Sequence, residues 1–187
     1  MQTTQWLLAS VIGLSSAIAY AGASQAEELT CQGSLAETTI DNLRVPDGAT
    51  CTLTNTQIEG NIKVESGAVL IATGVSVKGN IQAENAAQVN VDGQSTVGGS
   101  IQIKQSEAAS IVDTLIGGDL QFEQNTQPLL SQSNTIGGNL QAFGNSNSLT
   151  IVDNRIDGNL QCKENNPSPT GSDNLVGGNK EDQCAAF

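Results

Sequence analysis

The sequence contains no histidine and has few aromatic or basic residues. Its 187 residues include 3% aromatics and 7 Lys and Arg against 19 Asp and Glu, a net charge of −12. Without histidine, the chain cannot form the Ser-His or Cys-His pairs of nucleophilic catalysis or a His-ligated zinc site. So acidic a chain cannot neutralise phosphates over a surface, and we expect no nucleic-acid partner. The scarcity of aromatic rings also disfavours recognition of sugars or bases by stacking.

The only tryptophan and the only tyrosine lie in an apolar stretch near the N-terminus. Residues 6–23 form an apolar stretch broken by Ser10, Gly13, Ser15 and Ser16, small residues follow, and the first charged residue is Glu27. These features predict a secretory signal peptide over residues 1–26, although its first five residues carry no Lys or Arg. An uncleaved membrane anchor is the alternative, because this stretch is at the lower length limit for crossing a bilayer.

Export sets the expected location of the rest of the chain. We expect the protein to be secreted, periplasmic or displayed on a cell surface, with no membrane insertion after cleavage. The single Asn-x-Ser/Thr triplet, at Asn166, is excluded as a glycosylation acceptor by Pro167. A bacterial envelope or its surroundings therefore fits better than a eukaryotic secretory route.

A short motif recurs through the remainder of the chain. It reads Ile/Val-x-Gly-Asn-Ile/Leu, usually followed by Gln, and each glycine precedes the next by 19 or 20 residues. The aligned glycines are Gly60, Gly79, Gly99, Gly118, Gly138, Gly158 and Gly178. A degenerate eighth copy without the glycine starts at Ile40. We expect each glycine at a corner that needs a positive φ or a close backbone approach, and the asparagine after it to form a ladder of amides.

Apolar and polar residues alternate around each glycine. The position four residues after the glycine is apolar: Val64, Ala83, Ile103, Phe122, Ala142 and Cys162. A period of two indicates strands with one buried face, and no segment after residue 30 keeps a period of 3.6. Short strands repeated in register predict an all-β, single-stranded parallel β-helix of about eight coils. The strict hexapeptides of left-handed β-helices are missing, which favours the right-handed form.

Residues 40–184 resemble the secreted bacterial right-handed β-helix (β-solenoid) repeat proteins. The resemblance rests on the glycine motif, on residues 45–51 (VPDGATC) and on residues 178–184 (GNKEDQC). It implies an architecture and no shared activity. Bactofilins, which polymerise, are a looser likeness, because they lack a signal peptide and cysteine staples. We divide the chain into the signal peptide, an N-terminal cap over residues 27–39 and the β-helix over residues 40–187.

Four cysteines follow the signal peptide. Cys31 and Cys51 are 20 residues apart, and Cys162 and Cys184 are 22 apart, about one coil in each case. An even number at this spacing in an exported protein predicts disulfides. Of the three pairings, only Cys31–Cys51 with Cys162–Cys184 avoids crossing the length of the rod, and it would clamp each end. A cysteine metal site is the alternative, disfavoured because no Cys-x-x-Cys pair occurs.

The strongest candidate for chemistry is a column of carboxylates five residues before the glycines. Asp113, Asp153 and Asp173 occupy it, and Arg155 lies two residues after Asp153. β-Helical polysaccharide lyases and hydrolases need carboxylates on adjoining coils, often with Arg or Ca²⁺. The plainer interpretation, which we favour, is that these aspartates are turn residues that bond to nearby backbone.

The next column, four residues before the glycines, bears on ice binding. It begins with Thr56 and Val75 and ends with three asparagines, so it lacks the regular threonines that an ice-binding face would need.

We expect a non-catalytic, exported structural or interaction protein with a scaffold or adhesion-like role and no cofactor. It would be an envelope component or would associate with itself. The alternatives are a small polysaccharide lyase or hydrolase that uses the aspartate column, or an acidic calcium-binding surface module.

Overall fold

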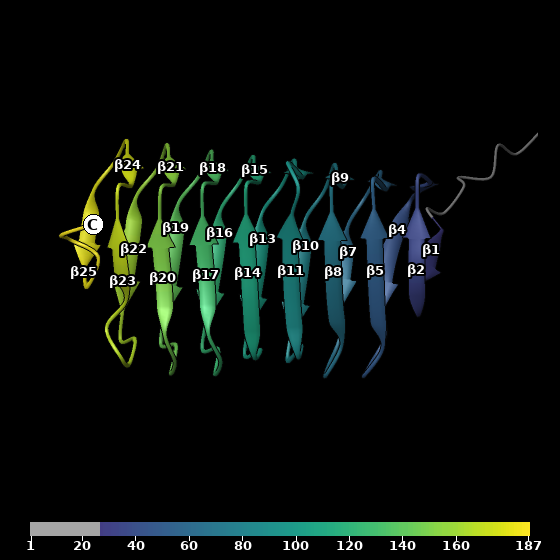
Figure 1. Ribbon diagram of the computed structural model, residues 1–187, viewed down its shortest axis with the longest axis horizontal. Coiled ribbons are helices and arrows are strands. Elements are labelled where there is room, and N and C mark those ends of the chain that lie inside the picture. Colours follow the sequence, from purple (N-terminus) through teal and green to yellow (C-terminus); the bar gives the residue numbers. More distant parts are fainter. Residues whose placement is uncertain (1–26) are drawn as a thin grey trace, which may run out of the picture.

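The computed structural model describes residues 27–187 and shows only strands and turns over that range. The predicted signal peptide lies outside the described residues. Three parallel sheets run the length of a rod, and each coil adds one strand to each sheet (Figure 1). From the N- to the C-terminus, the chain rises through the front sheet, crosses the top and descends behind, which is a right-handed winding. The predicted all-β, right-handed parallel β-helix of about eight coils is confirmed.

Sheet A lies at the rear of Figure 1 and contains nine strands. They are β1 (Glu28–Thr30), β4 (Asn42–Val45), β7 (Ile62–Val64), β10 (Ile81–Glu84), β13 (Ile101–Lys104), β16 (Leu120–Glu123), β19 (Leu140–Phe143), β22 (Leu160–Lys163) and β25 (Lys180–Asp182). Sheet B is the front sheet and contains eight strands. They are β2 (Gly33–Ala36), β5 (Thr50–Thr54), β8 (Val69–Thr73), β11 (Gln88–Asp92), β14 (Ala108–Val112), β17 (Leu129–Gln132), β20 (Leu149–Val152) and β23 (Thr170–Ser172).

Sheet C closes the coil and consists of eight two-residue strands. They are β3 (Thr39–Ile40), β6 (Gln57–Ile58), β9 (Ser76–Val77), β12 (Thr96–Val97), β15 (Leu115–Ile116), β18 (Thr135–Ile136), β21 (Arg155–Ile156) and β24 (Leu175–Val176). At the N-terminal end, β1 pairs with β4 and β2 pairs with β5. The stretch assigned to an N-terminal cap therefore supplies strands of the first coil, and the solenoid starts at Glu28.

The core fills the inside of the rod, as the alternation of apolar residues predicts. All six side chains of the four-after column are buried. Phe122 is the largest of the fully buried side chains, and its cross-strand partners are Ile103 and the smaller Ala142. A large side chain thus stacks on a small one, which keeps the interior filled. Burial of each such side chain contributes about 1.5–3 kcal/mol relative to exposure.

The coils differ in length by one residue, and the corners absorb the difference. Val69 pairs with Gln88, nineteen residues on, whereas Gln88 pairs with Ala108, twenty residues on. The extra residue lies in the corner after β11, where Gly93 and Gln94 both have a positive φ. In later coils, the corner between sheets A and B takes the extra residue instead. The strands stay in register, so the inward side chains remain inward.

Candidate functional site

The aspartate column lies at the corner between sheets B and C. Asp113, Asp153 and Asp173 are exposed and directly follow β14, β20 and β23. Their φ angles are 48°, 56° and 59°, in the left-handed region. Aspartate and asparagine tolerate this conformation better than most residues, because their short side chains can bond locally. The backbone geometry therefore accounts for the aspartates as turn residues.

The arginine near this column is paired elsewhere. Arg155 Nη2 lies 3.3 Å from Asp157 Oδ1, two residues along the same outer surface, and both side chains are more than half exposed. Among residues 27–187, no ion pair joins Arg155 to Asp153 or Asp173. Within the same part of the chain, no three Cys, Asp or Glu side chains are grouped closely enough to hold a metal ion. The register places Asp153 beside Asp173 on adjoining coils, whereas Ser133 separates Asp113 from Asp153, so the structure brings together two of the three carboxylates and leaves the arginine paired with Asp157.

The seven repeat glycines lie at the corner between sheets C and A, and close approach explains them. None of the seven has a positive φ. A Cβ atom on Gly138 would lie 2.2 Å from Asp119 Oδ1, and one on Gly79 would lie 2.5 Å from Asn61 Oδ1. The neighbouring coil's side chain sits here because its oxygen accepts the backbone N–H of the residue after the glycine, as from Asn80 to Asn61 at 2.9 Å.

The predicted asparagine ladder runs along this corner. The N–H of Asn159 donates to Asn139 Oδ1 at 2.9 Å, and that of Asn179 donates to Asn159 Oδ1 at 2.8 Å. Ser100 and Asp119 stand in for asparagine and accept in the same way. In the degenerate first copy, an asparagine side chain, that of Asn42, already accepts from the next coil. The ladder joins successive coils outside the sheets.

The cysteines form the two predicted disulfides, Cys31–Cys51 and Cys162–Cys184. All four side chains are buried. Beside the second bond, Gln183 Oε1 accepts from the Asn165 backbone N–H at 2.9 Å and from Asn165 Nδ2 at 3.0 Å. The C-terminal turn thus supplies the acceptor that a further coil would have supplied.

Two buried ladders of amides were not predicted from the sequence. Inside the B–C corner, Asn154 Oδ1 accepts from the backbone N–H and Nδ2 of Asn134 and from Ser131 Oγ, at 3.0–3.1 Å. Its own Nδ2 donates to the Ser131 carbonyl and to Asn174 Oδ1, both at 3.0 Å. A second ladder fills the A–B corner. It consists of Asn125, Asn145 and Asn165. The recurrence of asparagine every twenty residues in both corners was the available signal.

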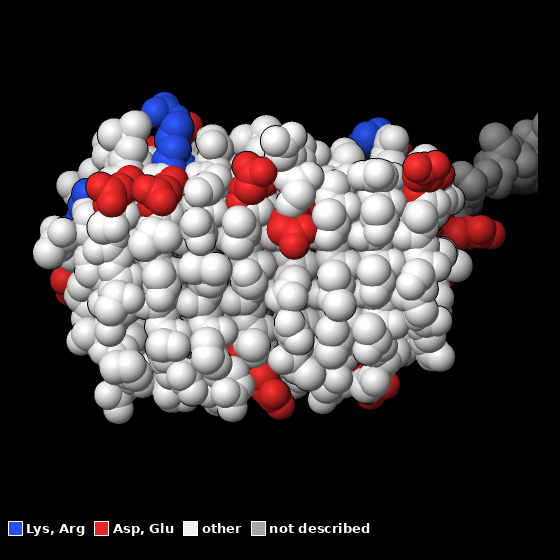
Figure 2. Space-filling model, in the orientation of Figure 1, with Lys and Arg blue, Asp and Glu red and all other residues white. Residues whose placement is uncertain are grey.

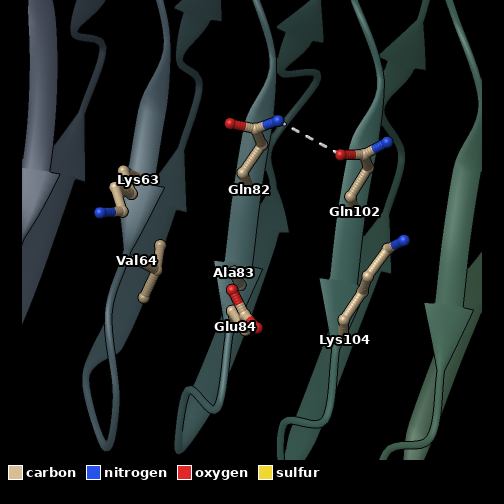
Figure 3. Close-up of a pocket in the computed structure, with 7 residues that line it drawn as sticks. All are labelled: Lys63, Val64, Gln82, Ala83, Glu84, Gln102 and Lys104. Atoms are coloured by element: carbon tan, nitrogen blue, oxygen red, sulfur yellow. Dashed lines mark hydrogen bonds between the residues drawn. The ribbon is translucent and has the colours of Figure 1, made fainter.

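The outer face of sheet A carries a ladder of glutamines. Gln82 Nε2 donates to Gln102 Oε1 at 3.3 Å, as Figure 3 shows, and the series continues through Gln121 and Gln141 to Gln161. It ends where Gln161 donates to Glu181 at 2.8 Å. These bonds again run between coils. A shallow hollow of about 270 Å³ lies over the first part of this ladder.

The two lysines that line the hollow, Lys63 and Lys104, pair with glutamates beside it. The register places Lys104 between Glu84 and Glu123, as expected, but its ammonium bonds only toward Glu123, at 2.9 Å. In Figure 3, the Lys104 side chain leans away from Glu84. A hydrogen bond from Lys63 lowers the pKa of Glu65 below its usual value, and a second bond from Arg44 adds to this.

Similarity to known proteins gives no indication of what this chain does. Comparison with protein-family models, curated proteins and solved structures found no match. Over residues 27–187, no helix is long and apolar enough to span a membrane. Any functional conclusion rests on the residues themselves.

Proposed function

We propose that this chain is a non-catalytic, exported structural or interaction protein of a bacterial envelope or its surroundings. Two disulfides with all four cysteines used are compatible with an extracellular or periplasmic location, because such bonds persist in oxidising compartments. The predicted signal peptide supports the same location. Attribution to bacteria and to the envelope rests on the sequence features given above.

The observation that carries the non-catalytic part of the proposal is the placement of the aspartate column. General acid–base chemistry needs groups that converge on one bond and whose protonation is tuned by their surroundings. Asp113, Asp153 and Asp173 instead point into solvent from tight corners, and the nearby arginine pairs with Asp157. Most of the other side-chain hydrogen bonds described above join one coil to the next.

The test compares the exported protein with Asp153→Asn on a panel of neutral and uronic-acid polysaccharides. Release of reducing ends and of unsaturated products is measured for both. We expect no release from either protein. A matched control is Glu107→Gln, an exposed carboxylate at the A–B corner of a nearby coil. Cleavage by the parent that Asp153→Asn abolishes and Glu107→Gln leaves intact would overturn the proposal and favour the polysaccharide-active alternative.

Calcium binding is tested separately by titration calorimetry. We expect no saturable heat from Ca²⁺ at physiological salt, because only two of the corner aspartates, Asp153 and Asp173, are neighbours and both are exposed to solvent. Saturable binding that Asp153→Asn removes would favour the calcium-binding module instead.

A further inference from the structure

The two ends of the rod are finished differently. At the C-terminal end, the turn after β25 covers the last coil: Gln183 supplies the acceptor of a further coil, and the Phe187 ring packs over Gly171 of β23. At the N-terminal end, β1, β2 and β3 are the outermost strands of the three sheets, and no strand among residues 27–187 pairs with their outer edges. Residues 27–39 thus form a first coil without a cap. Open sheet edges of this kind offer hydrogen bonds to another strand.

The apolar side chains of the first coil are partly uncovered. Leu29 lies in the same column as the buried Leu43 but is itself 42% exposed, and Leu35 is half-buried. A hollow of about 570 Å³ lies at this end and is lined by residues 27–29 and 38–41. In Figure 2 the end is on the right, with acidic side chains along its upper part and an uncharged lower part. The end therefore combines unpaired strands with apolar surface.

Alternate residues of the first coil direct their backbone N–H and C=O groups away from the rod. The carbonyl of Glu27 and the amide of Cys31 bond to the second coil. In a parallel strand, the residues between such positions direct their backbone groups to the other side, here toward the open end. The bonds of Glu37 and Thr38 to the second coil give the same alternation in β2 and β3. The residues directed toward the open end are Glu28, Thr30, Ser34, Ala36 and Thr39.

The first coil is short, and its two halves match. Glu28 pairs with Asn42, fourteen residues on, whereas the next coil takes nineteen. Gln32 stands at the corner between β1 and β2, and the residues directed toward the open end lie two and four positions to either side of it. Thr39 lies seven residues after Gln32, half the length of the coil. The same order of backbone groups is therefore met on both sides of a line through Gln32 and Thr39.

We propose that two copies of the exported chain associate end to end through their first coils. A two-fold axis through Gln32 and Thr39 exchanges the two halves of the coil. Strand β1 of each copy then lies antiparallel to β2 of the other, and β3 lies against β3. The inference rests on the proposed function, in which residues 1–26 are removed and the protein acts by interaction. It names the surface and the partner, a second copy of this chain.

The residues that this axis brings together are compatible. Glu28 lies opposite Ala36 of the other copy. Thr30 lies opposite Ser34, and the two copies of Thr39 lie opposite each other. Each of these pairs can exchange two backbone hydrogen bonds, about ten in all. No like charges meet among them, although like charges directly opposite would weaken an antiparallel pair.

The same axis brings apolar side chains together inside the joined rods. Leu29 lies opposite Leu35 of the other copy, on the inner side of the sheets, so each covers surface that the first coil leaves exposed. The strand length and the distance between packed sheets give the end an area of about 400 Å² per copy. A total of about 800 Å² is small for a specific interface, so we expect a reversible dimer with a dissociation constant in the micromolar range.

Charge at the corners limits the strength of this contact. Glu37 lies opposite Asp41 of the other copy, so the dimer contains two contacts between like charges. Asp41 Oδ2 accepts from the Glu27 backbone nitrogen at 3.3 Å, and after cleavage at residue 26 this nitrogen is an ammonium that offsets part of the repulsion. Salt screens the remainder. Dimerisation should therefore strengthen as the ionic strength rises.

Other occupants match the end less well. The C-terminal end of a second copy is covered by residues 183–187, which hinders stacking of copies in one direction. A single extended strand of another protein pairs with one side of the coil and leaves the other two open. A coil of the same outline meets all three sides at once.

The test follows association of the exported chain by sedimentation velocity, from low micromolar to several hundred micromolar, with removal of residues 1–26 confirmed by mass. Leu29→Asp places a carboxylate in the centre of the contact. Leu175→Asp is the matched control, because it changes an exposed leucine in the last coil. Circular dichroism checks that both variants keep the fold. We expect the parent and Leu175→Asp to dimerise equally and Leu29→Asp to dimerise at least about tenfold more weakly, because its carboxylates would be buried without partners.

A cysteine variant tests the axis itself. Hydrogen-bonded partners across an antiparallel pair have Cα atoms about 5.5 Å apart, within the range that a disulfide spans. Thr39→Cys should therefore link two copies on mild oxidation. Thr96→Cys, on the same sheet in the middle of the rod, should not. Peptide mapping checks that the two native disulfides are retained.

Several results would overturn the proposal. These are a parent that stays monomeric at several hundred micromolar, equal losses in Leu29→Asp and Leu175→Asp, and equal cross-linking of the two cysteine variants. Growth beyond a dimer would assign the contact to unlike ends. An exported protein that retains residues 1–26 and is monomeric would assign the end to that segment. Since the polysaccharide-cleavage assay is independent of association, the proposed function can fail or survive separately.

Discussion

The C-terminal disulfide should hold the last coil of the solenoid in place. Cys162 lies in β22 and Cys184 in the final turn; they are 22 positions apart in sequence, and their Cα atoms are 5.3 Å apart. The coil that they enclose buries little apolar surface of its own, since Leu175 is 61% exposed and Val176 only half-buried. Two prolines, Pro167 and Pro169, also remove backbone donors from it.

The size of the effect follows from the length of the enclosed loop. Closing a loop of about 22 residues is worth about 3 kcal/mol in the chain-entropy account of disulfides. We therefore expect Cys162→Ser to lower the free energy of opening of the last coil by about 3 kcal/mol, which corresponds to about a hundredfold loss of protection against hydrogen exchange. Because each coil of a solenoid contacts only its neighbouring coils, the loss of protection should stay at the C-terminal end.

Hydrogen exchange at single amides measures this directly. The informative amides are those of Leu175 and Gly177, which donate to carbonyls of the preceding coil at 2.9 and 2.8 Å. The amide of Gly117, bonded at 2.8 Å in the middle of the rod, is the internal reference. Cys162→Ala separates loss of the bond from burial of a serine hydroxyl. Unchanged protection at the two terminal amides in both variants, or an equal loss at Gly117, would refute the reasoning.

Three other predictions address different parts of the molecule. The exported protein should contain no Trp and no Tyr, so its absorbance at the wavelength where Trp and Tyr absorb, about 280 nm, should come almost wholly from disulfides. Ordinary Trp and Tyr absorbance there would mean that residues 1–26 are retained. Asn154→Ala should lower the free energy of unfolding in urea by about 3 kcal/mol, because it leaves several buried groups unpaired. Asn159→Ala, in the solvent-facing ladder, should lower it by about 1 kcal/mol or less. Equal decreases in the two variants would contradict the assignment of the buried ladder. The pKa of Glu65 in the folded protein lies below the ordinary value of 4.5, so the ionised Glu65 stabilises the fold above pH 4.5, and this stabilisation is lost as the pH falls through the folded-state pKa. In an NMR titration, Lys63→Gln should raise the pKa of Glu65, and Lys104→Gln should leave it unchanged.

The fold was predictable from the sequence because the pattern is local and repeated. The apolar residues flanking each repeat glycine give a period of two, and the constant spacing of those glycines stacks the strands in parallel. The disulfide pairing also followed, since Cys31 and Cys162 each have a partner about one coil away.

The side-chain ladders and the ends of the rod were harder to predict. Asn134 and Thr56 are polar residues near turns, which normally indicates exposure, yet both point inward where the corner leaves backbone groups to satisfy. The repeat glycines were expected to need either a positive φ or a close approach, and the folded structure shows that it is the close approach. The open N-terminal end could not be predicted because residues 27–39 lack the glycine motif, and only the pairing of β1 and β2 with the second coil shows that they form strands.

The corners that absorb an extra residue set how this protein can change during evolution. An insertion inside a strand would turn the following side chains from core to solvent until the next corner, and selection would remove it. An insertion at a corner such as Gly93–Gln94 leaves every strand in register. Indels should therefore accumulate along the edges of the rod, where loops can lengthen and acquire contacts. The flat faces and the interior would keep their order while the number of residues per coil drifts.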